Sequence, residues 1–97
     1  MKISINHSDA IRPRGDLGVE PVADGLLILD KRNQKIHQLN STAGAVWTSI
    51  QKGHEPKSIT RKIVEFFDVS PQEAAKDVTR ILEEFNALNL LEARDSR

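Results

Sequence analysis

The chain has 97 residues, of which 38% are hydrophobic and 4% aromatic, and its 14 basic residues balance its 14 acidic ones. Such a length supports one hydrophobic core and therefore one domain. The balanced charge argues against nucleic acid or an anionic membrane as the partner, and the absence of cysteine excludes disulfides, thiolate metal sites and cysteine catalysis. No segment has the length and hydrophobicity of a signal peptide or a membrane span, so we expect a soluble, cytoplasmic protein.

The first part of the chain is polar and carries few structural signals. The alternation in KISI (residues 2–5) indicates either an edge strand or a flexible segment, and RPRGDLG (residues 12–18) is typical of a turn because it contains Pro and two Gly. We therefore expect residues 1–18 to be an N-terminal segment, residues 19–92 to form the domain, and residues 93–97 to be a frayed tail.

Three short stretches with the character of β-strands follow. The first, VEPV (residues 19–22), contains Pro21, which restricts a strand to an edge of the sheet or to a strand start. The next two, LLILD (residues 26–30) and KIHQL (residues 35–39), are joined by a short polar loop and predict a β-hairpin. Asn33 is the best candidate for a left-handed backbone conformation in that loop.

The hydrophobic period changes to that of an α-helix at Asn40. Either Asn40 or Ser41 can cap this first helix. Its apolar face consists of Ala43, Val46, Trp47 and Ile50, which lie at helical spacing, and we expect Trp47 to pack the hairpin against the helices. A second helix is expected over residues 58–67. The third begins at SPQE (residues 70–73), where Ser is the cap, Pro takes the first helical position and Glu completes a capping box.

The third helix has an apolar stripe that is expected to face the core. The stripe consists of Ala74, Val78, Ile81, Leu82, Phe85 and Leu88. Asn89 is suited to the C-terminal cap, and LLEA (residues 90–93) predicts a short extended segment that packs back. Because strands precede helices, the order predicts an α+β domain. We expect a winged-helix-like fold, with a small antiparallel sheet of two or three strands followed by three helices.

The sequence offers no set of residues for catalysis or metal binding. His7, His37 and His54 have no ligand partner at helical spacing, so we expect no metal site. The adjacent Glu83 and Glu84 point about 100° apart on a helix, which does not suit paired acid–base catalysis. There is no phosphate-binding loop and no nucleophile–base pair. The sequence therefore favours a protein that is not an enzyme and has no cofactor.

A winged-helix-like fold makes nucleic-acid binding an alternative function. The last helix would then enter the major groove, but acidic residues outnumber basic ones from Pro71 to Arg97. DNA affinity depends on Lys and Arg side chains at the phosphates, so this interpretation is the weaker one. A third hypothesis is a structural partner in which the hairpin edge pairs across a two-fold axis.

The segment DGLLILDKRNQKIHQLNSTAGAVW (residues 24–47) carries a combination of residues found in a known family. A hairpin ends in Leu39 and Asn40, and the helix that follows has Thr42, Ala43, Val46 and Trp47. Further along are Gly53, Ile59, Ile63, Asp77, Val78, Leu82, Phe85, Leu88, Leu90 and Leu91. This pattern, over residues 24–92, resembles the PqqD family, named for the small protein of pyrroloquinoline quinone biosynthesis.

The resemblance implies a non-catalytic peptide-binding chaperone without a cofactor. In this family the leader of a precursor peptide adds as a strand to the open edge of the third strand. The peptide also lies in a groove beside the last helix and is presented to a radical S-adenosylmethionine (SAM) enzyme. The implied partners here are a precursor peptide and a radical SAM or other peptide-modifying enzyme, in pyrroloquinoline quinone biosynthesis or a related modified-peptide pathway. We expect a monomer or a weak homodimer.

The implied peptide-binding residues lie on the third strand and the last helix. They are Lys35, Ile36, His37, Gln38 and Leu39 on the strand, and Ala75, Val78, Leu82 and Phe85 on the helix. The strand contains no Pro, so it can pair with an added strand along its whole length. Alternation places Ile36 and Gln38 on one face and His37 and Leu39 on the other, with Leu39 toward the core. On the helix, either the flank with Leu82 and Ala75 or the flank with Ile81 and Leu88 can face the groove.

Overall fold

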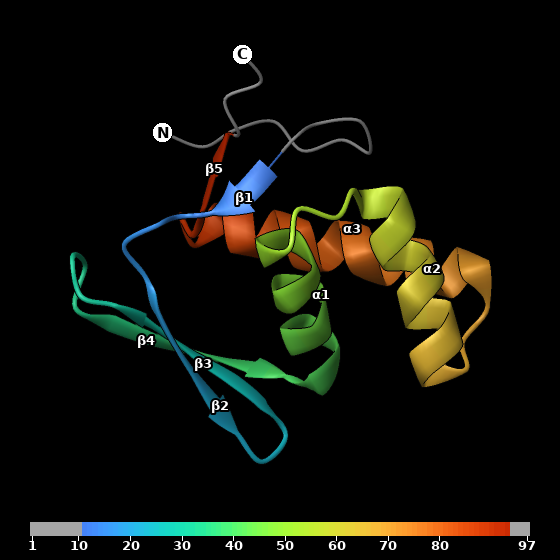
Figure 1. The fold of residues 1–97 in the computed structure, drawn as a ribbon, viewed down its shortest axis with the longest axis horizontal. Coiled ribbons are helices and arrows are strands. Elements are labelled where there is room, and N and C mark those ends of the chain that lie inside the picture. Colours follow the sequence, from blue (N-terminus) through green and yellow to red (C-terminus); the bar gives the residue numbers. More distant parts are fainter. Residues whose placement is uncertain (1–10, 94–97) are drawn as a thin grey trace.

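The computed structural model of the protein describes residues 11–93. The elements in chain order are β1 (Ile11–Pro13), β2 (Gly18–Val22), β3 (Gly25–Asp30), β4 (Lys35–Asn40), α1 (Ser41–Gln51), α2 (Pro56–Phe67), α3 (Pro71–Ala87) and β5 (Leu91–Ala93). Figure 1 shows the sheet of β2, β3 and β4 projecting from one side of a body formed by the three helices. The predicted α+β fold, with a small antiparallel sheet followed by three helices, is confirmed.

The strands form two antiparallel sheets and not one. The larger sheet has the order β2-β3-β4, and β1 pairs with β5 in a separate two-stranded sheet. The extended segment predicted after the third helix is β5. The expected domain of residues 19–92 leaves out β1, yet the side chains of Ile11 and Arg14 are buried. The predictions for residues 1–10 and 94–97 lie outside the described residues.

A two-residue turn joins β2 to β3, with Val22 opposite Gly25. A Cβ atom at Gly25 would collide with the backbone carbonyl oxygen of Leu39 on the neighbouring strand. Glycine is therefore required at this position at the start of β3. Pro21 lies in β2, which is an edge strand, as its Pro predicts.

The turn between β3 and β4 differs from the prediction in one respect. Gln34, and not Asn33, has the left-handed backbone conformation, with φ of 55°. Asn33 donates two hydrogen bonds to the carboxylate of Asp30, from its backbone N–H at 3.2 Å and from Nδ2 at 2.8 Å. The Asn33 side chain is therefore used to close the turn, and the next residue takes the left-handed position.

The helix ends follow local signals in the sequence. The Asn40 side chain accepts the N–H three residues ahead at 2.9 Å, and the Ser70 hydroxyl does the same at 3.1 Å, so both predicted caps are confirmed. Helix α2 begins at Pro56 and not at residue 58, because Pro is well tolerated at the first helical position. Asn89, with φ of 61°, follows the end of α3 in the left-handed conformation expected of a helix-terminating residue.

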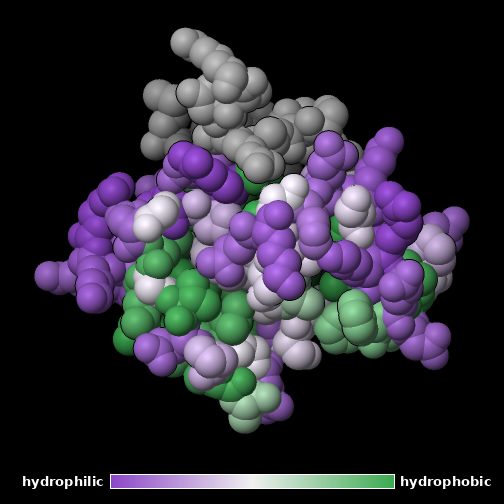
Figure 2. Space-filling model, in the orientation of Figure 1, coloured by the Kyte–Doolittle hydropathy of each residue, from purple (hydrophilic) through white to green (hydrophobic). Residues whose placement is uncertain are grey.

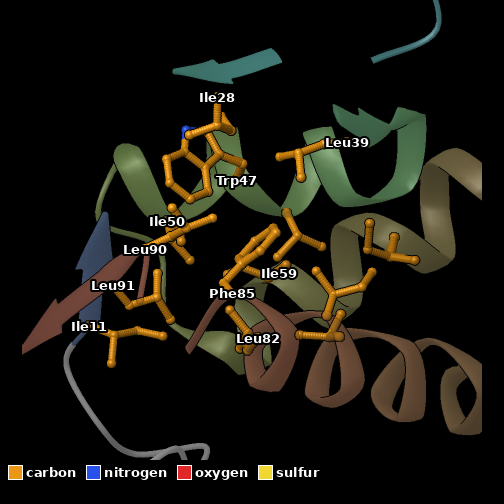
Figure 3. Close-up of a cluster of buried hydrophobic side chains, with 14 of the residues drawn as sticks. Ile11, Ile28, Leu39, Trp47, Ile50, Ile59, Leu82, Phe85, Leu90 and Leu91 are labelled. Atoms are coloured by element: carbon orange, nitrogen blue, oxygen red, sulfur yellow. The ribbon is translucent and has the colours of Figure 1, made fainter. Parts of the chain in front are cut away.

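A single core joins the two sheets to the three helices (Figure 3). Trp47 of α1 is fully buried, and its ring meets Phe85 of α3 edge-on with centroids 5.2 Å apart and an interplanar angle of 86°. Such pairs contribute about 0.5–1.5 kcal/mol beyond simple burial. Ile28 of β3 is also fully buried in this cluster, so Trp47 has the packing role that its position predicts.

The apolar stripe of α3 ends at Phe85 and not at Leu88. Leu88 was predicted to face the core, but it follows the last helical residue and is 44% exposed. The chain turns away from the helical path at this point, so Leu88 leaves the line of the stripe. None of the helices in residues 11–93 combines the length and the hydrophobicity needed to cross a membrane.

Candidate functional site

The outer edge of β2 lacks one hydrogen-bond donor. Because only two residues separate Val22 from Gly25, this pair must close the hairpin with backbone hydrogen bonds. Backbone N–H and C=O groups alternate in direction along an antiparallel strand. Val22 directs its backbone groups toward β3, so residue 21 directs its backbone groups away from the sheet. Residue 21 is Pro, which has no N–H to direct outward. Pro21 therefore blunts the β2 edge without breaking the pairing with β3.

By the same reasoning, the outer edge of β4 has all of its backbone hydrogen-bond donors. On β3, Gly25 and every second residue after it bond to β2, so the residues between them bond to β4. Their partners on β4 are Lys35 and every second residue after it. The backbone groups of Ile36 and Gln38 consequently point to the open side of the sheet. Since β4 contains no Pro, this edge can accept a further strand.

The side chains of β4 divide between two faces as predicted. Leu39 is buried with 6% exposure and belongs to the core, whereas Ile36 is 68% exposed. Lys35 and Gln38 are also exposed, and His37 is half-buried. The Nε2 atom of His37 is inaccessible and has no hydrogen-bond partner within residues 11–93. An unpaired buried polar atom is costly, so β4 contains one polar group whose bonding is incomplete.

The predicted site residues on α3 occupy different environments. Val78, Leu82 and Phe85 are at most 2% exposed and pack in the core, so in this structure they do not form a surface that a peptide could touch. On the other flank Ile81 is also buried, with 2% exposure, whereas Leu88 is 44% exposed. Only Ala75 among the predicted α3 residues reaches the surface, where it is half-buried.

Ala75 lines an open groove along α3. The groove has a volume of about 690 Å³, and its lining residues in the described part of the chain are Ala75, Lys76, Thr79, Arg80, Glu83, Glu84 and Ala87. Arg80 forms ion pairs with Glu84 at 2.9 Å and with Asp77 at 3.8 Å. The small side chains of Ala75 and Ala87 leave space between these charged groups.

An ion-pair network around the buried Arg14 and Asp30 lies at the end of β3 and was not expected from the sequence. The Arg14 guanidinium bonds to both oxygens of Asp30, at 3.0 and 3.3 Å, and to both oxygens of Asp16, at 3.1 and 2.7 Å. It also donates to the backbone carbonyl of Asn89 at 3.0 Å. Only 6% of the Arg14 side chain and 1% of the Asp30 side chain are exposed. Arg14 thus joins the segment after β1, the β3–β4 turn and the end of α3.

These contacts change the ionisation of the three groups. Hydrogen bonds to Asp16 and Asp30 raise the pKa of Arg14, so its positive charge is permanent. The Arg14 guanidinium lowers the pKa of Asp16. Hydrogen bonds from Arg14 and then from Asn33 hold the pKa of Asp30 well below its ordinary value. All three groups are therefore charged at neutral pH. Both oxygens of Asp30 accept hydrogen bonds within the protein, as is typical of a carboxylate that stabilises the fold.

The described residues contain no cluster of three or more His, Cys, Asp or Glu side chains that could hold a metal ion. His54 contacts Lys62, with 2.8 Å between Nδ1 and Nζ, and belongs to the α1–α2 connection. His37 lies on β4. The two histidines that the structure describes are thus parts of separate elements.

Comparison with solved structures shows the same fold in proteins of low sequence identity. A lasso peptide synthetase B1 complexed with its leader peptide has 22% identity and a TM-score of 0.78, covering 86% of this chain and 98% of the other. TbiB1 in complex with the TbiA(beta) leader peptide has 16% identity and a TM-score of 0.79, covering 88% and 99%.

A third structure is the PqqD truncation of Methylobacterium extorquens PqqCD, solved by NMR and described as a functional, stand-alone recognition element for ribosomally synthesized and post-translationally modified peptides. It has 16% identity and a TM-score of 0.76, covering 92% of this chain and 95% of the other. No curated protein matches the chain. The family model described as coenzyme PQQ synthesis protein D matches residues 25–91, and the chain therefore belongs to the PqqD family.

Proposed function

We propose that the protein is a non-catalytic peptide-binding chaperone. It captures the leader of a precursor peptide by strand addition to β4 and presents the peptide to a modifying enzyme, such as a radical SAM protein. The pathway is pyrroloquinoline quinone biosynthesis or a related modified-peptide pathway, and the protein works in the cytoplasm as a monomer or weak homodimer.

The observation that carries this proposal is the difference between the two edges of the sheet. The outward backbone groups of Ile36 and Gln38 on β4 are available to an extended peptide, whereas Pro21 removes a donor from the edge of β2. Main-chain hydrogen bonds then provide affinity, and side-chain contacts on either face provide specificity.

The solved structures with this fold support the same conclusion. Two of them are named as complexes with leader peptides, and the third is described as a recognition element for modified peptides. The groove beside Ala75 on α3 is our candidate for the second contact with the peptide. The three clearly shifted pKa values among the described residues belong to the Arg14 network, whose ion pairs support a structural role and not catalysis.

The charges of α3 give no support to the nucleic-acid alternative. Helix α3 has Lys76 and Arg80 as its basic residues, and Arg80 is engaged with Asp77 and Glu84. A helix that binds the major groove needs free cations for the phosphates. The charge distribution of α3 therefore favours a peptide partner.

The test is a titration of the isotope-labelled full chain with synthetic leader peptides of precursor peptides, followed by NMR. We expect amide shifts in β4 (Lys35–Asn40) and along the α3 groove from Ala75 to Ala87. Shifts confined to the β2 edge or to α2, or no binding, would contradict the proposal. A matched titration with short duplex DNA at low salt is expected to give no shifts.

A further inference from the structure

A second cavity lies at the end of the sheet where β3 turns into β4. It has a volume of about 370 Å³ and is lined by Leu29, Asp30, Lys31, Gln34, Lys35 and Ile36. Figure 2 shows hydrophobic residues gathered over the part of the surface where the three-stranded sheet lies in Figure 1. The lining of the cavity includes the half-buried Leu29 and the exposed Ile36, so part of its wall is apolar and lies outside the core.

The apolar wall of this cavity is formed by one cross-strand pair. Leu29 and Ile36 are direct partners in the β3–β4 register, and both belong to the face of the sheet opposite to that of the buried Ile28. Leu29 is half-buried and Ile36 is 68% exposed. A residue of an added strand opposite Ile36 would place its side chain on this same face, beside the Leu29–Ile36 pair.

The polar wall of the cavity carries positive charge. Lys31 and Lys35 are exposed, and neither has an ion-pair partner among residues 11–93. The neighbouring carboxylates of Asp16 and Asp30 do not offset them, because the guanidinium groups of Arg14 and Arg32 balance both of these charges. Two uncompensated ammonium groups thus stand beside an aliphatic surface.

We propose that this cavity is a specificity subsite for the bound peptide. It takes an aliphatic side chain against Leu29 and Ile36, and an acidic side chain within two positions of that residue meets Lys31 and Lys35. This inference rests on the proposed binding of a peptide to β4. It adds which side chains the bound peptide carries. The aliphatic contact provides burial, and the acidic contact provides discrimination against basic peptides.

The test selects peptides from a randomised phage-displayed library with the full-length protein and with two charge-reversal variants. The wild type is expected to enrich an acidic residue within two positions of an aliphatic one. Lys31→Glu with Lys35→Glu is expected to replace that acidic residue by a basic one. The matched control reverses two other exposed lysines, Lys52→Glu with Lys57→Glu, and is expected to keep the acidic preference.

The strength of the acidic preference is then measured with two synthetic peptides that differ only in having Glu or Lys at the enriched position. We expect the Glu peptide to bind the wild type about tenfold more tightly than the Lys peptide at low salt, with a smaller ratio at about 1 M salt because exposed charges are screened. Ile36→Ser is expected to remove the aliphatic preference and leave the acidic one.

The outcomes separate this inference from the proposed function. If peptides are selected and bind β4, but show no acidic preference or keep it in Lys31→Glu with Lys35→Glu, the subsite is wrong and the peptide-binding function stands. If no peptide is selected, or if the selected peptides shift no amide of β4, both are wrong.

Discussion

The two edges of the three-stranded sheet have opposite character although they belong to the same small structure. The β2 edge has Pro21 at a position that would otherwise direct an N–H outward, and the β4 edge directs the backbone groups of Ile36 and Gln38 to the open side. An unpaired edge is a template for any extended chain unless the sequence blocks it. One edge is therefore blunted and the other is open, which is why we propose that an added strand pairs with β4.

The turns beside the two edges also differ in their support. The turn before β4 is held by Asp30, which bonds to Arg14 and Asn33. The turn after β2 consists of Ala23 and Asp24, which are both exposed and form no side-chain hydrogen bond with the rest of residues 11–93. A strand that is ordered before binding loses less conformational entropy when a peptide adds to it. The supported edge is thus the one suited to binding.

The largest effect is expected from removing that support. Arg14→Leu leaves the buried carboxylate of Asp30 without its guanidinium partner, and breaking a buried pair in this way is strongly destabilising. We expect the Tm to fall by about 10 °C or more, measured by circular dichroism. We also expect amide exchange to become faster in β4 than in β2, because Arg14 bonds to the β3–β4 turn and not to the β2–β3 turn.

A double variant is the control for this prediction. In Arg14→Leu with Asp30→Leu no buried charge is left unpaired, and replacing a buried pair by apolar residues is often neutral. We therefore expect part of the lost Tm to return, although the hydrogen bonds from Asn33 to Asp30 are also lost. A single variant Arg14→Leu whose Tm stays within about 2 °C of the wild type would show that the network does not support the turn.

The next largest effect is expected from giving β4 the residue that blunts β2. Gln38→Pro removes an N–H that points to the open side, so the fold is retained while one carbonyl of the peptide loses its donor. We expect binding of a β4-directed peptide to weaken about 10- to 100-fold, measured by fluorescence anisotropy. Gln38→Thr keeps the N–H and is the matched control, with affinity close to that of the wild type. Equal affinities for the two variants would mean that the peptide does not pair with this edge.

A smaller loss of stability is expected when the pH is lowered. The pKa values of Asp16 and Asp30 are lowered by Arg14, so the unfolded state binds more protons than the native state at low pH. The stability that these carboxylates contribute is complete above the ordinary aspartate pKa of about 3.9 and is lost as the pH falls through their lower native values.

We therefore expect the Tm to fall between about pH 5 and about pH 2, measured by calorimetry at each pH. Asp30→Asn should flatten this dependence because it removes one of the two carboxylates whose pKa is lowered, while Asp16 remains. Asp77→Asn is the comparison, since Asp77 is in an exposed pair on α3 that contributes little. If the Tm of Asp30→Asn falls with pH as steeply as that of the wild type, Asp30 does not cause the loss of stability in acid.

The features that the sequence predicts correctly depend on short-range signals. The caps at Asn40 and Ser70 each need a side chain and an N–H three residues ahead, and the exposure of Ile36 with the burial of Leu39 follows from alternation. On α3, periodicity identifies the apolar stripe but cannot distinguish a core from a groove. Phe85 and the other apolar site residues of that stripe are buried because α1 and α2 pack against them.

The features that the sequence does not reveal join distant segments. Arg14 and Asp30 are 16 residues apart, and Arg14 and the carbonyl of Asn89 are 75 apart. The β1–β5 pair connects two strands of three residues each from opposite ends of the described chain. The one available signal is the charge of Asp30 at the end of an apolar strand, because a buried carboxylate requires a partner. That signal predicts that Asp30 has a partner, but it does not identify Arg14 as that partner.

The smallest effect is expected from opening the blocked edge. Pro21→Thr restores an outward N–H on β2 and adds a residue with high strand propensity, while the side chain at residue 21 remains exposed as in the wild type. We expect the free energy of unfolding to change by less than about 1 kcal/mol.

The effect of Pro21→Thr should appear in self-association, because two sheet edges are then available on each molecule. Sedimentation velocity over a range of concentrations is expected to show more dimer than for the wild type. Glu20→Thr, which keeps Pro21 and adds the same residue to β2, is the matched control and should behave as the wild type. If Pro21→Thr and Glu20→Thr self-associate equally, the missing N–H does not keep β2 unpaired, and the preference of an added strand for β4 must come from side chains such as Ile36 and Lys35 alone.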